Sequence, residues 1–323
     1  MWEKRKFVRD LVNGETVDEI FSVKFKKPLR PYARGMMFEA RVTDRTGDIT
    51  VKYWGSPDEA IVDQVYSSFK AGDVIHVRGS ASLYNDVLEI GVSPEKGGAV
   101  EPLPFGEYNV TDFLPQSAED LDHLMSRLNS YIRKVRDPHL RSLLANFFSD
   151  EAFVYRFRAS PASIQLHSNW MGGLLEHTLA VVETCDCYAR IHPELDWDLT
   201  ITGAILHDIG KVEEYEITSN INISAEGLLR GHIVIGEQMV NAMIEEMEDF
   251  PTNLRLKVLH IILGSHGRRE HGSPTEPQFP EALAVHLADL SDAKLEQYIF
   301  AKANASTDDP WYYDRRLGHI YLR

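Results

Sequence analysis

The sequence has few of the features that would place a protein outside the cytoplasm or in a membrane. Its 323 residues include only two cysteines, Cys185 and Cys187. Residues two apart on a helix point about 200° apart, so neither a disulfide nor a shared metal is expected between them. Apolar runs such as 233–235 and 261–263 are too short to span a bilayer. The first residues lack the apolar stretch of a secretory signal. We therefore expect a cytoplasmic protein with reduced thiols and no membrane contact.

An excess of basic charge is also missing, and the charge is unevenly distributed. Residues 1–100 carry 15 basic and 15 acidic groups, whereas the remaining residues carry 19 basic and 34 acidic groups, which gives the net charge of −15. An acidic second half argues against nonspecific phosphate binding over that whole surface. It still allows a local phosphate site whose metal supplies positive charge. The length and the change of character near residue 100 predict two domains.

Short alternating segments predict a small β-barrel in residues 18–100. Residues 37–42 and 49–54 alternate between apolar and polar side chains, and the Asp-Arg-Thr-Gly sequence at 44–47 is typical of a turn. About five short strands with one inserted helix favour a Greek-key barrel of the OB type. The remaining predicted elements are strands at 74–78 and 87–92 and a helix at 58–69.

Helical spacing of apolar residues dominates the second half. We expect an α+β protein with an OB-type barrel at residues 1–104, a proline- and glycine-containing linker at 105–117, and an all-α domain at 118–323 that ends in an aromatic C-terminal extension. The predicted helices cover 138–148, 174–189, 199–215, 231–247, 253–263 and 279–301.

A set of histidines and aspartates in the helical half suggests a metal site. Each member lies beside an aliphatic or glycine-rich stretch, where an ionisable group is costly without a partner. Imidazole and carboxylate together suit Mn, Fe, Co, Ni or Zn. The long, irregular spacing excludes a zinc finger and fits ligands that converge from several helices. The set consists of His177, His207, Asp208, His232, His266 and Asp289.

The order of these residues resembles the HD-domain superfamily of metal-dependent phosphohydrolases. Within that superfamily, the sequences His-Asp-Ile-Gly-Lys at 207–211, Ser-His-Gly-Arg-Arg-Glu-His-Gly-Ser-Pro at 265–274 and Ala-Asp-Leu-Ser-Asp-Ala-Lys at 288–294 are similar to the YhaM-type 3′→5′ exoribonucleases. Those proteins also have an N-terminal OB domain with an Asp-x-Thr-Gly turn, followed by a strand that ends in Trp. The turn at 44–47 and Trp54 match that pattern, so the resemblance covers nearly the whole chain.

The resemblance implies a divalent metal, with Mn²⁺ as the expected ion and Fe²⁺, Co²⁺, Ni²⁺ or Mg²⁺ as alternatives. A second ion would share the Asp208 carboxylate. Related proteins often have two adjacent histidines where this chain has Ser265 and His266, so we expect the second ion to bind weakly. Asp208 and Lys211 are the predicted catalytic residues, with Lys211 positioned to bind a phosphate oxygen. The first ion would be held by His177, His207, Asp208 and Asp289, and the second by Asp208, His232 and His266.

Candidate substrate contacts lie in both halves. Arg268 and Arg269 follow the last predicted histidine ligand. OB barrels bind single strands with aromatic platforms and scattered basic groups. The zero net charge of the first 100 residues predicts a guiding role for the barrel rather than tight independent binding. The barrel candidates are Arg41, Lys52, Trp54 and Tyr84.

Together these features predict a metal-dependent 3′→5′ exonuclease that hydrolyses single-stranded RNA, with single-stranded DNA as a second candidate substrate, to 5′-mononucleotides. One alternative is a phosphohydrolase of small or cyclic nucleotides with a regulatory OB domain. Another is a non-catalytic nucleic-acid-binding protein whose HD site has decayed, although the complete first ligand set counts against it. The sequence leaves the oligomeric state open, with a homo-oligomer as one option.

Overall fold

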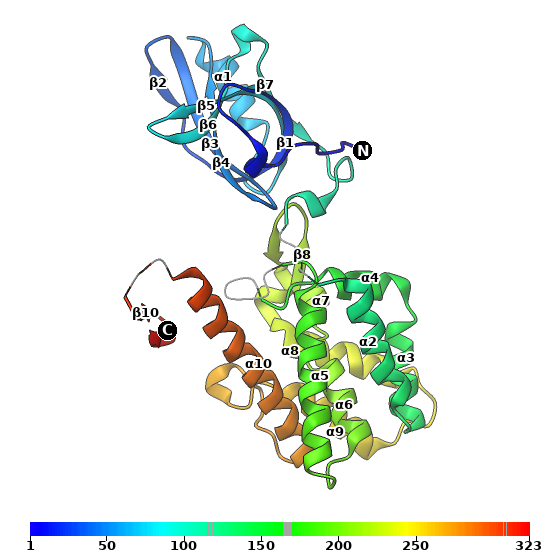
Figure 1. The fold of residues 1–323 in the computed structure, drawn as a ribbon. Coiled ribbons are helices and arrows are strands. Elements are labelled where there is room, and N and C mark those ends of the chain that lie inside the picture. Colours follow the sequence, from blue (N-terminus) through cyan, green and yellow to red (C-terminus); the bar gives the residue numbers. More distant parts are fainter. Residues whose placement is uncertain (115–116, 118, 164–169, 306, 308) are drawn as a thin grey trace. The chain divides into compact units, whose positions relative to one another are not determined.

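The computed structural model describes residues 1–114, 117, 119–163, 170–305, 307 and 309–323. The chain forms two compact units (Figure 1). The first contains Met1–Gln116 and Ile217–Ile221, and the second contains Ser117–Glu216 and Asn222–Arg323. Among the described helices, none is both long and apolar enough to cross a membrane.

The first unit is a closed five-stranded barrel. Strands pair in the order β1-β3-β4-β6-β5, and β5 pairs back with β1 to close the ring. All of these pairings are antiparallel except β4 with β6, which is parallel. The predicted Greek-key barrel of OB type is therefore confirmed. Its elements are β1 (Thr16–Lys26), β2 (Arg30–Tyr32), β3 (Gly35–Asp44), β4 (Gly47–Trp54), α1 (Glu59–Ser67), β5 (Val74–Tyr84), β6 (Val87–Val92) and β7 (Ala99–Leu103), with short 3-10 turns at Val8–Asp10, Pro94–Lys96 and Val110–Asp112.

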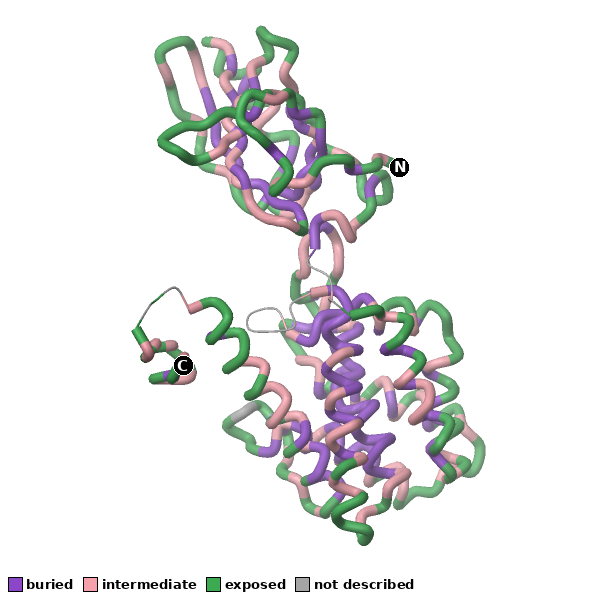
Figure 2. The backbone as a smooth tube through the Cα atoms, in the orientation of Figure 1, coloured by how far each residue is buried: buried purple, intermediate pink, exposed green. Residues whose placement is uncertain are grey.

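Apolar side chains from alternate strand positions fill the barrel. Phe38 is completely buried and stacks on Tyr53, with ring centroids 4.9 Å apart. Along β4 the buried positions alternate with partly exposed ones, so Lys52 and Trp54 lie on the face opposite to Tyr53. Figure 2 shows the buried residues concentrated along these strands.

The segment expected to be a linker, 105–117, packs on the barrel in its described part. Tyr108 and Phe113 are buried against Ile20 and Val74, and their rings meet edge to face at 5.5 Å. These residues therefore contribute apolar burial to the first unit.

The second unit is helical, with a large core between its helices. Every residue of α6 from Leu199 to its end is buried, so this helix lacks a polar face and lies inside the bundle. Figure 2 shows the same for much of α5. The elements from residue 121 onward are α2 (Leu121–Lys134), α3 (Pro138–Phe148), α4 (Glu151–Ala159), α5 (Gly173–Ile191), α6 (Trp197–Leu206), α7 (Lys211–Glu214), β8 (Tyr215–Ile217), β9 (Ile221–Ile223), α8 (Ala225–Glu245), α9 (Thr252–Gly264), a 3-10 turn at Arg269–His271, α10 (Pro280–Asn304), β10 (Trp311–Asp314) and β11 (Gly318–Tyr321). The part of the β8–β9 hairpin from Ile217 to Ile221 belongs to the first unit.

The prediction of a single helix at 199–215 is wrong. The structure ends α6 at Leu206, turns through residues 207–210, and resumes helix only for the four residues of α7. A second break lies in α8, where Gly231 has φ of 70° and ψ of 154°. Glycine adopts a positive φ without the steric cost that other residues meet. Both breaks lie next to candidate ligands: the first at His207 and Asp208, the second just before His232.

The first break brings the chain very close to α8. A Cβ atom on Gly210 would lie 2.0 Å from the carbonyl oxygen of His232 and 2.5 Å from the amide nitrogen of Gly236. Both neighbours are backbone atoms, which cannot move aside as a flexible side chain can.

We therefore predict that Gly210→Ala destabilises the protein by at least about 1–3 kcal/mol, the usual cost of overpacking. Chemical denaturation of the two proteins would measure the difference. Gly264→Ala is the matched control, because its nearest neighbour, a Pro277 nitrogen at 3.5 Å, is at ordinary contact distance. Equal stability of the two variants would contradict the close approach at Gly210.

Candidate metal centre

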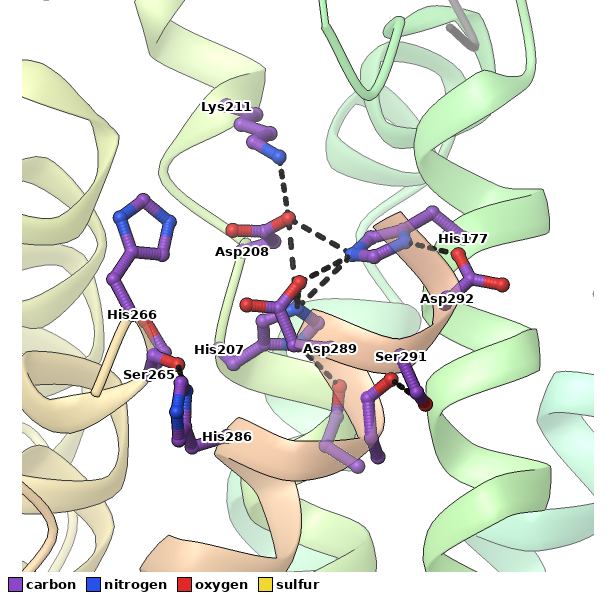
Figure 3. A network of polar contacts seen from close by, with 12 residues as sticks. His177, His207, Asp208, Lys211, Ser265, His266, His286, Asp289, Ser291 and Asp292 are labelled. Carbon is purple, nitrogen blue, oxygen red and sulfur yellow. Dashed lines mark hydrogen bonds and ion pairs between the residues drawn. The ribbon is translucent and has the colours of Figure 1, made fainter. Parts of the chain in front are cut away.

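The candidate ligands come from five helices, either from within a helix or from its end or break. His177 lies in α5, and His207 and Asp208 follow directly after α6. His232 restarts α8 after its break, His266 follows α9, and Asp289 lies in α10. The structure thus brings all six predicted ligands into one region of the bundle, most of which Figure 3 shows from close by.

Three of these residues form a first group. The ligand atoms of His177, His207 and Asp289 all lie within 4.8 Å of one another. The two imidazole Nε2 atoms are 3.3 Å apart, and His177 Nε2 is also 3.3 Å from Asp289 Oδ1. Two neutral imidazoles and a carboxylate at this spacing form a donor set suited to a divalent transition metal.

A second group adjoins the first and shares a carboxylate with it. Asp208, His232 and His266 also lie within 4.8 Å of one another, with the two imidazole Nε2 atoms 3.4 Å apart. Asp208 Oδ1 faces His232 Nε2 at 3.5 Å, while Asp208 Oδ2 faces His177 Nε2 at 3.3 Å. One carboxylate therefore points one oxygen at each group.

Hydrogen bonds on the far side of three rings fix which nitrogen faces inward. His207 Nδ1 donates to the carbonyl of Ala204 at 2.8 Å, and His177 Nδ1 donates to Asp292 Oδ2 at 2.6 Å. His232 Nδ1 donates to Glu214 Oε1 at 3.1 Å. With Nδ1–H donated to these acceptors, Nε2 is the ring nitrogen left to bind a cation, as the outer hydrogen-bond partners of metal-ligating histidines usually arrange.

The sequence analysis missed Asp292 and Glu214. Their only signals are weak: each is an acidic residue three positions after a candidate site residue, Asp289 and Lys211 respectively, which is one helical turn. Nothing in the sequence alone says which of the many acidic residues reaches a histidine ring.

Lys211 lies one turn after Asp208 and donates to its Oδ2. Burial raises the pKa of Asp208, but the charges of Lys211 and the surrounding histidines outweigh it and hold the pKa well below its usual value. Burial likewise opposes the charged form of Asp289, and hydrogen bonding to His177 lowers its pKa overall. Both carboxylates are therefore ionised at neutral pH.

The surroundings of the histidines shift their pKa values in different directions. Burial lowers the pKa of His207 and of His266, which favours the neutral, ligating form. Burial acts in the same direction on His177, but hydrogen bonds to Asp208, Asp289 and Asp292 outweigh it and raise its pKa well above 6.5. In the metal-free protein, His177 thus holds a proton within a ring of carboxylates.

One buried atom shows that the site fits a cation. Among the described residues, Asp208 Oδ1 finds no hydrogen-bond partner although it is fully shielded from solvent. A buried, ionised oxygen without a partner is expensive. A divalent ion between Asp208, His232 and His266 would satisfy this oxygen, and the donor set present fits that group.

Ser265 occupies the position where the related pattern often has another histidine. It is completely buried, and its carbonyl accepts a 2.7 Å hydrogen bond from His286 Nδ1. The His286 ring also fills the space beside Gly267, so it supports the turn that carries His266. Among the described His, Cys, Asp and Glu residues, three form the second group, against four donors around the first when Asp208 is counted.

The predicted substrate contacts are not all free cations. Lys52 forms an ion pair with Glu89 at 2.6 Å and lies 4.5 Å from the centroid of the Tyr84 ring. Arg41 donates to Thr50 Oγ1 at 3.1 Å, and its Nε lies 3.9 Å from Asp48. Arg268 and Arg269 are exposed in the turn after His266, and Arg268 pairs with Glu270. In the barrel, local acidic partners therefore offset the positive charge.

Trp54, the last residue of β4, lies beside a cleft. It lines this cleft of about 530 Å³ together with Arg78, Lys96 and several backbone segments of β1, β5 and β6. Its ring meets that of Tyr32 edge to face at 5.0 Å. The cleft thus brings an aromatic ring together with two basic residues and the acidic Asp18.

Comparison with known proteins agrees with this geometry. A model of the HD domain family matches residues 174–294, the span that supplies all six ligands. The 3′-5′ exoribonuclease YhaM of Halalkalibacterium halodurans is 28% identical over 87% of this chain and 84% of its own length. The protein of the same name from Bacillus subtilis is 28% identical over 87% of this chain and 86% of its own length. Among solved structures, a replication protein A heterotrimer bound to single-stranded DNA is 18% identical over 37% of this chain and 29% of its own, with a TM-score of 0.24, which is too low to support a conclusion.

We predict that Asp208→Asn abolishes the binding of both ions, because one carboxylate serves both groups of ligands. The amide keeps the volume of the side chain, so helical content measured by circular dichroism should stay unchanged. Metal analysis after incubation with Mn²⁺ and dialysis would test this. Retention of one tightly bound ion by the variant would show that Asp208 does not serve both groups.

A pH prediction follows from the shifted pKa values. The raised pKa of His177 stabilises the metal-free fold fully below the unfolded value of about 6.5, and this contribution is lost as the pH rises through the folded value. The lowered pKa of Asp208 stabilises the fold above about 3.9, and this is lost as the pH falls through the folded value. Metal-free stability from these groups should therefore be greatest between about pH 4 and 6.5.

Mn²⁺ binding at pH 7 must also release a proton from His177. Calorimetry in two buffers of different ionisation enthalpy would detect this release. Identical binding enthalpies in the two buffers would contradict it.

Proposed function

We propose that this chain, which carries an HD domain and is similar over most of its length to the YhaM 3′-5′ exoribonucleases, is a metal-dependent nuclease that shortens single-stranded RNA from its 3′ end. The proposed products are 5′-mononucleotides, and single-stranded DNA is a second candidate substrate. The proposal places the enzyme in the cytoplasm, where single-stranded RNA is found. Mn²⁺ is the proposed ion, although the same nitrogen and oxygen donors accept Fe²⁺, Co²⁺, Ni²⁺ or Mg²⁺.

The observation that carries the proposal is the pair of ligand groups joined by Asp208. Its two carboxylate oxygens face His177 on one side and His232 on the other at 3.3 and 3.5 Å. Phosphodiester hydrolysis requires both the attacking and the leaving oxygen to be stabilised. Divalent ions held in such groups lower the pKa of a bound water toward neutrality and neutralise the developing charge.

The residues of the chain have distinct proposed roles in that reaction. His177, His207 and Asp289 hold the first site, while His232 and His266 complete the second. Lys211 supplies an ammonium group beside Asp208 and is proposed to bind a nonbridging phosphate oxygen. Lys211 begins a four-residue helix directly after the His-Asp turn, so its ammonium would lie near a phosphate bound at the proposed metal centre.

We propose that the barrel and the turn after α9 guide the strand. A base can stack on Trp54 or Tyr84, because base–aromatic stacking tolerates any sequence. Arg268 and Arg269 are proposed to contact phosphates near the metal centre. Since Lys52 and Arg41 are partly neutralised by Glu89 and Asp48, the barrel is expected to add modest affinity rather than to bind RNA tightly alone. The domain limits proposed for this division are 1–104 and 118–323.

Incubating the metal-loaded protein with 5′-end-labelled single-stranded RNA should produce a ladder that shortens from the 3′ end. The same RNA blocked by a 3′-phosphate or annealed into a duplex tests whether a free single-stranded end is required. Asp208→Asn is the matched inactive control, and its activity should fall by several orders of magnitude because no ion remains bound.

Other outcomes would favour other functions. If small or cyclic nucleotides are hydrolysed while the RNA is not degraded, the protein is a small-nucleotide phosphohydrolase and not an exonuclease. RNA binding without hydrolysis under any of the five metal ions would indicate a binding protein. Cleavage in the interior of the RNA would retain the nuclease but exclude the 3′→5′ direction.

A further inference from the structure

Glu214 makes two contacts to one candidate ligand. Its Oε1 accepts a 3.1 Å hydrogen bond from His232 Nδ1 and another of 3.1 Å from the backbone amide of His232. Glu214 is only 8% exposed. A buried acceptor therefore holds both the ring and the backbone of the same residue.

These contacts lie where α8 is broken. Because Gly231 leaves the helical conformation, the amide of His232 starts a new helical segment and needs an acceptor. Glu214 supplies that acceptor and caps the segment. The same side chain thus fixes where α8 restarts and how the His232 ring is turned.

We propose that Glu214 is the positioning residue of the second metal subsite, and this inference rests on the proposed metal-dependent function. By accepting a hydrogen bond from Nδ1–H, Glu214 keeps Nε2 of His232 directed toward Asp208 and His266. The second group has three protein ligands where the first draws on four donors, so loss of orientation in one ligand matters more there. Asp292 has the corresponding contact with His177 in the first group, at 2.6 Å.

Because Glu214 and Asp292 contact histidines of different ligand groups, their effects on the two groups can be measured separately. Removing Glu214 should lower the affinity for the second ion by about 10–100-fold, the usual effect of losing a hydrogen-bond partner of a metal ligand, and leave the affinity for the first ion unchanged. Removing Asp292 should instead weaken the first ion. A purely structural role for Glu214 would lower stability without this selectivity.

The experiment titrates the full-length, metal-free chain with Mn²⁺ and follows the free ion by electron paramagnetic resonance. Glu214→Ala, Glu214→Gln and Asp292→Ala are compared with the unmodified chain. Gln retains an acceptor oxygen, so it should hold the second ion to within about threefold. Glu213→Ala is the matched control, since Glu213 is the adjacent residue of α7 and pairs with Arg156 at the surface.

A second measurement does not use metal. Nitrogen NMR of the histidine rings in the metal-free chain, with His232 identified from its substitution, should show the Nδ1–H tautomer in the unmodified chain and its loss in Glu214→Ala. If Glu214→Ala does not fold, Glu214→Asp replaces it, because the shorter chain keeps the charge but loses the reach to the ring.

The outcomes distinguish the two proposals. Failure of the unmodified chain to bind any ion would overturn the proposed function. If Glu214→Ala binds two ions with unchanged affinities, the role of Glu214 is overturned while the proposed function stands. The same holds if the tautomer of His232 does not change in that variant. Binding of a single ion even at millimolar Mn²⁺ would also overturn that role, because no second subsite would then exist.

Discussion

The helical unit depends on one buried charge, the carboxylate of Asp208. It is 2% exposed, and an ionised group in that position is tolerated only with close positive or hydrogen-bonding partners. Lys211 provides one, and the histidines of both groups provide the others. Helices α5, α8, α9 and α10 must therefore place their donor side chains around a single turn of chain, which explains why the ligands are far apart in sequence.

Backbone irregularity makes this convergence possible. A continuous helix through residues 199–215 would turn successive side chains around its axis and could not direct His207 and Asp208 into the same interior. The chain instead leaves the helix after Leu206 and approaches α8 so closely that only glycine fits at position 210. Within α8, Gly231 leaves the helical conformation, and this break lets His232 face the candidate metal centre.

These irregularities mark the limit of what the sequence could predict. The alternation of apolar residues at 37–42 and 49–54 was sufficient for the barrel, because one face of each strand must enter its core. The order of His177, His207, Asp208 and Asp289 indicated the HD fold through its resemblance.

The break after Leu206 was missed because α6 is apolar on all sides, so its periodicity contains no sign of an end. Glu214 and Asp292 were missed because their hydrogen bonds to the ligand histidines depend on packing between helices. Ion pairs such as Lys52 with Glu89 were missed because they depend on strand pairing.

Charge explains how an acidic unit could handle a polyanion. Residues after 100 carry 34 acidic against 19 basic groups, so long-range attraction of the proposed RNA substrate cannot come from this part of the chain. The attraction has to be local. In the metal-free protein, the Lys211 ammonium is engaged by Asp208. A divalent cation held by Asp208 would neutralise that carboxylate and leave the Lys211 ammonium for its proposed contact with a phosphate oxygen. The same buried carboxylate would thus keep the lysine engaged without metal and release it for substrate when metal is bound, so that phosphate affinity and metal occupancy rise together.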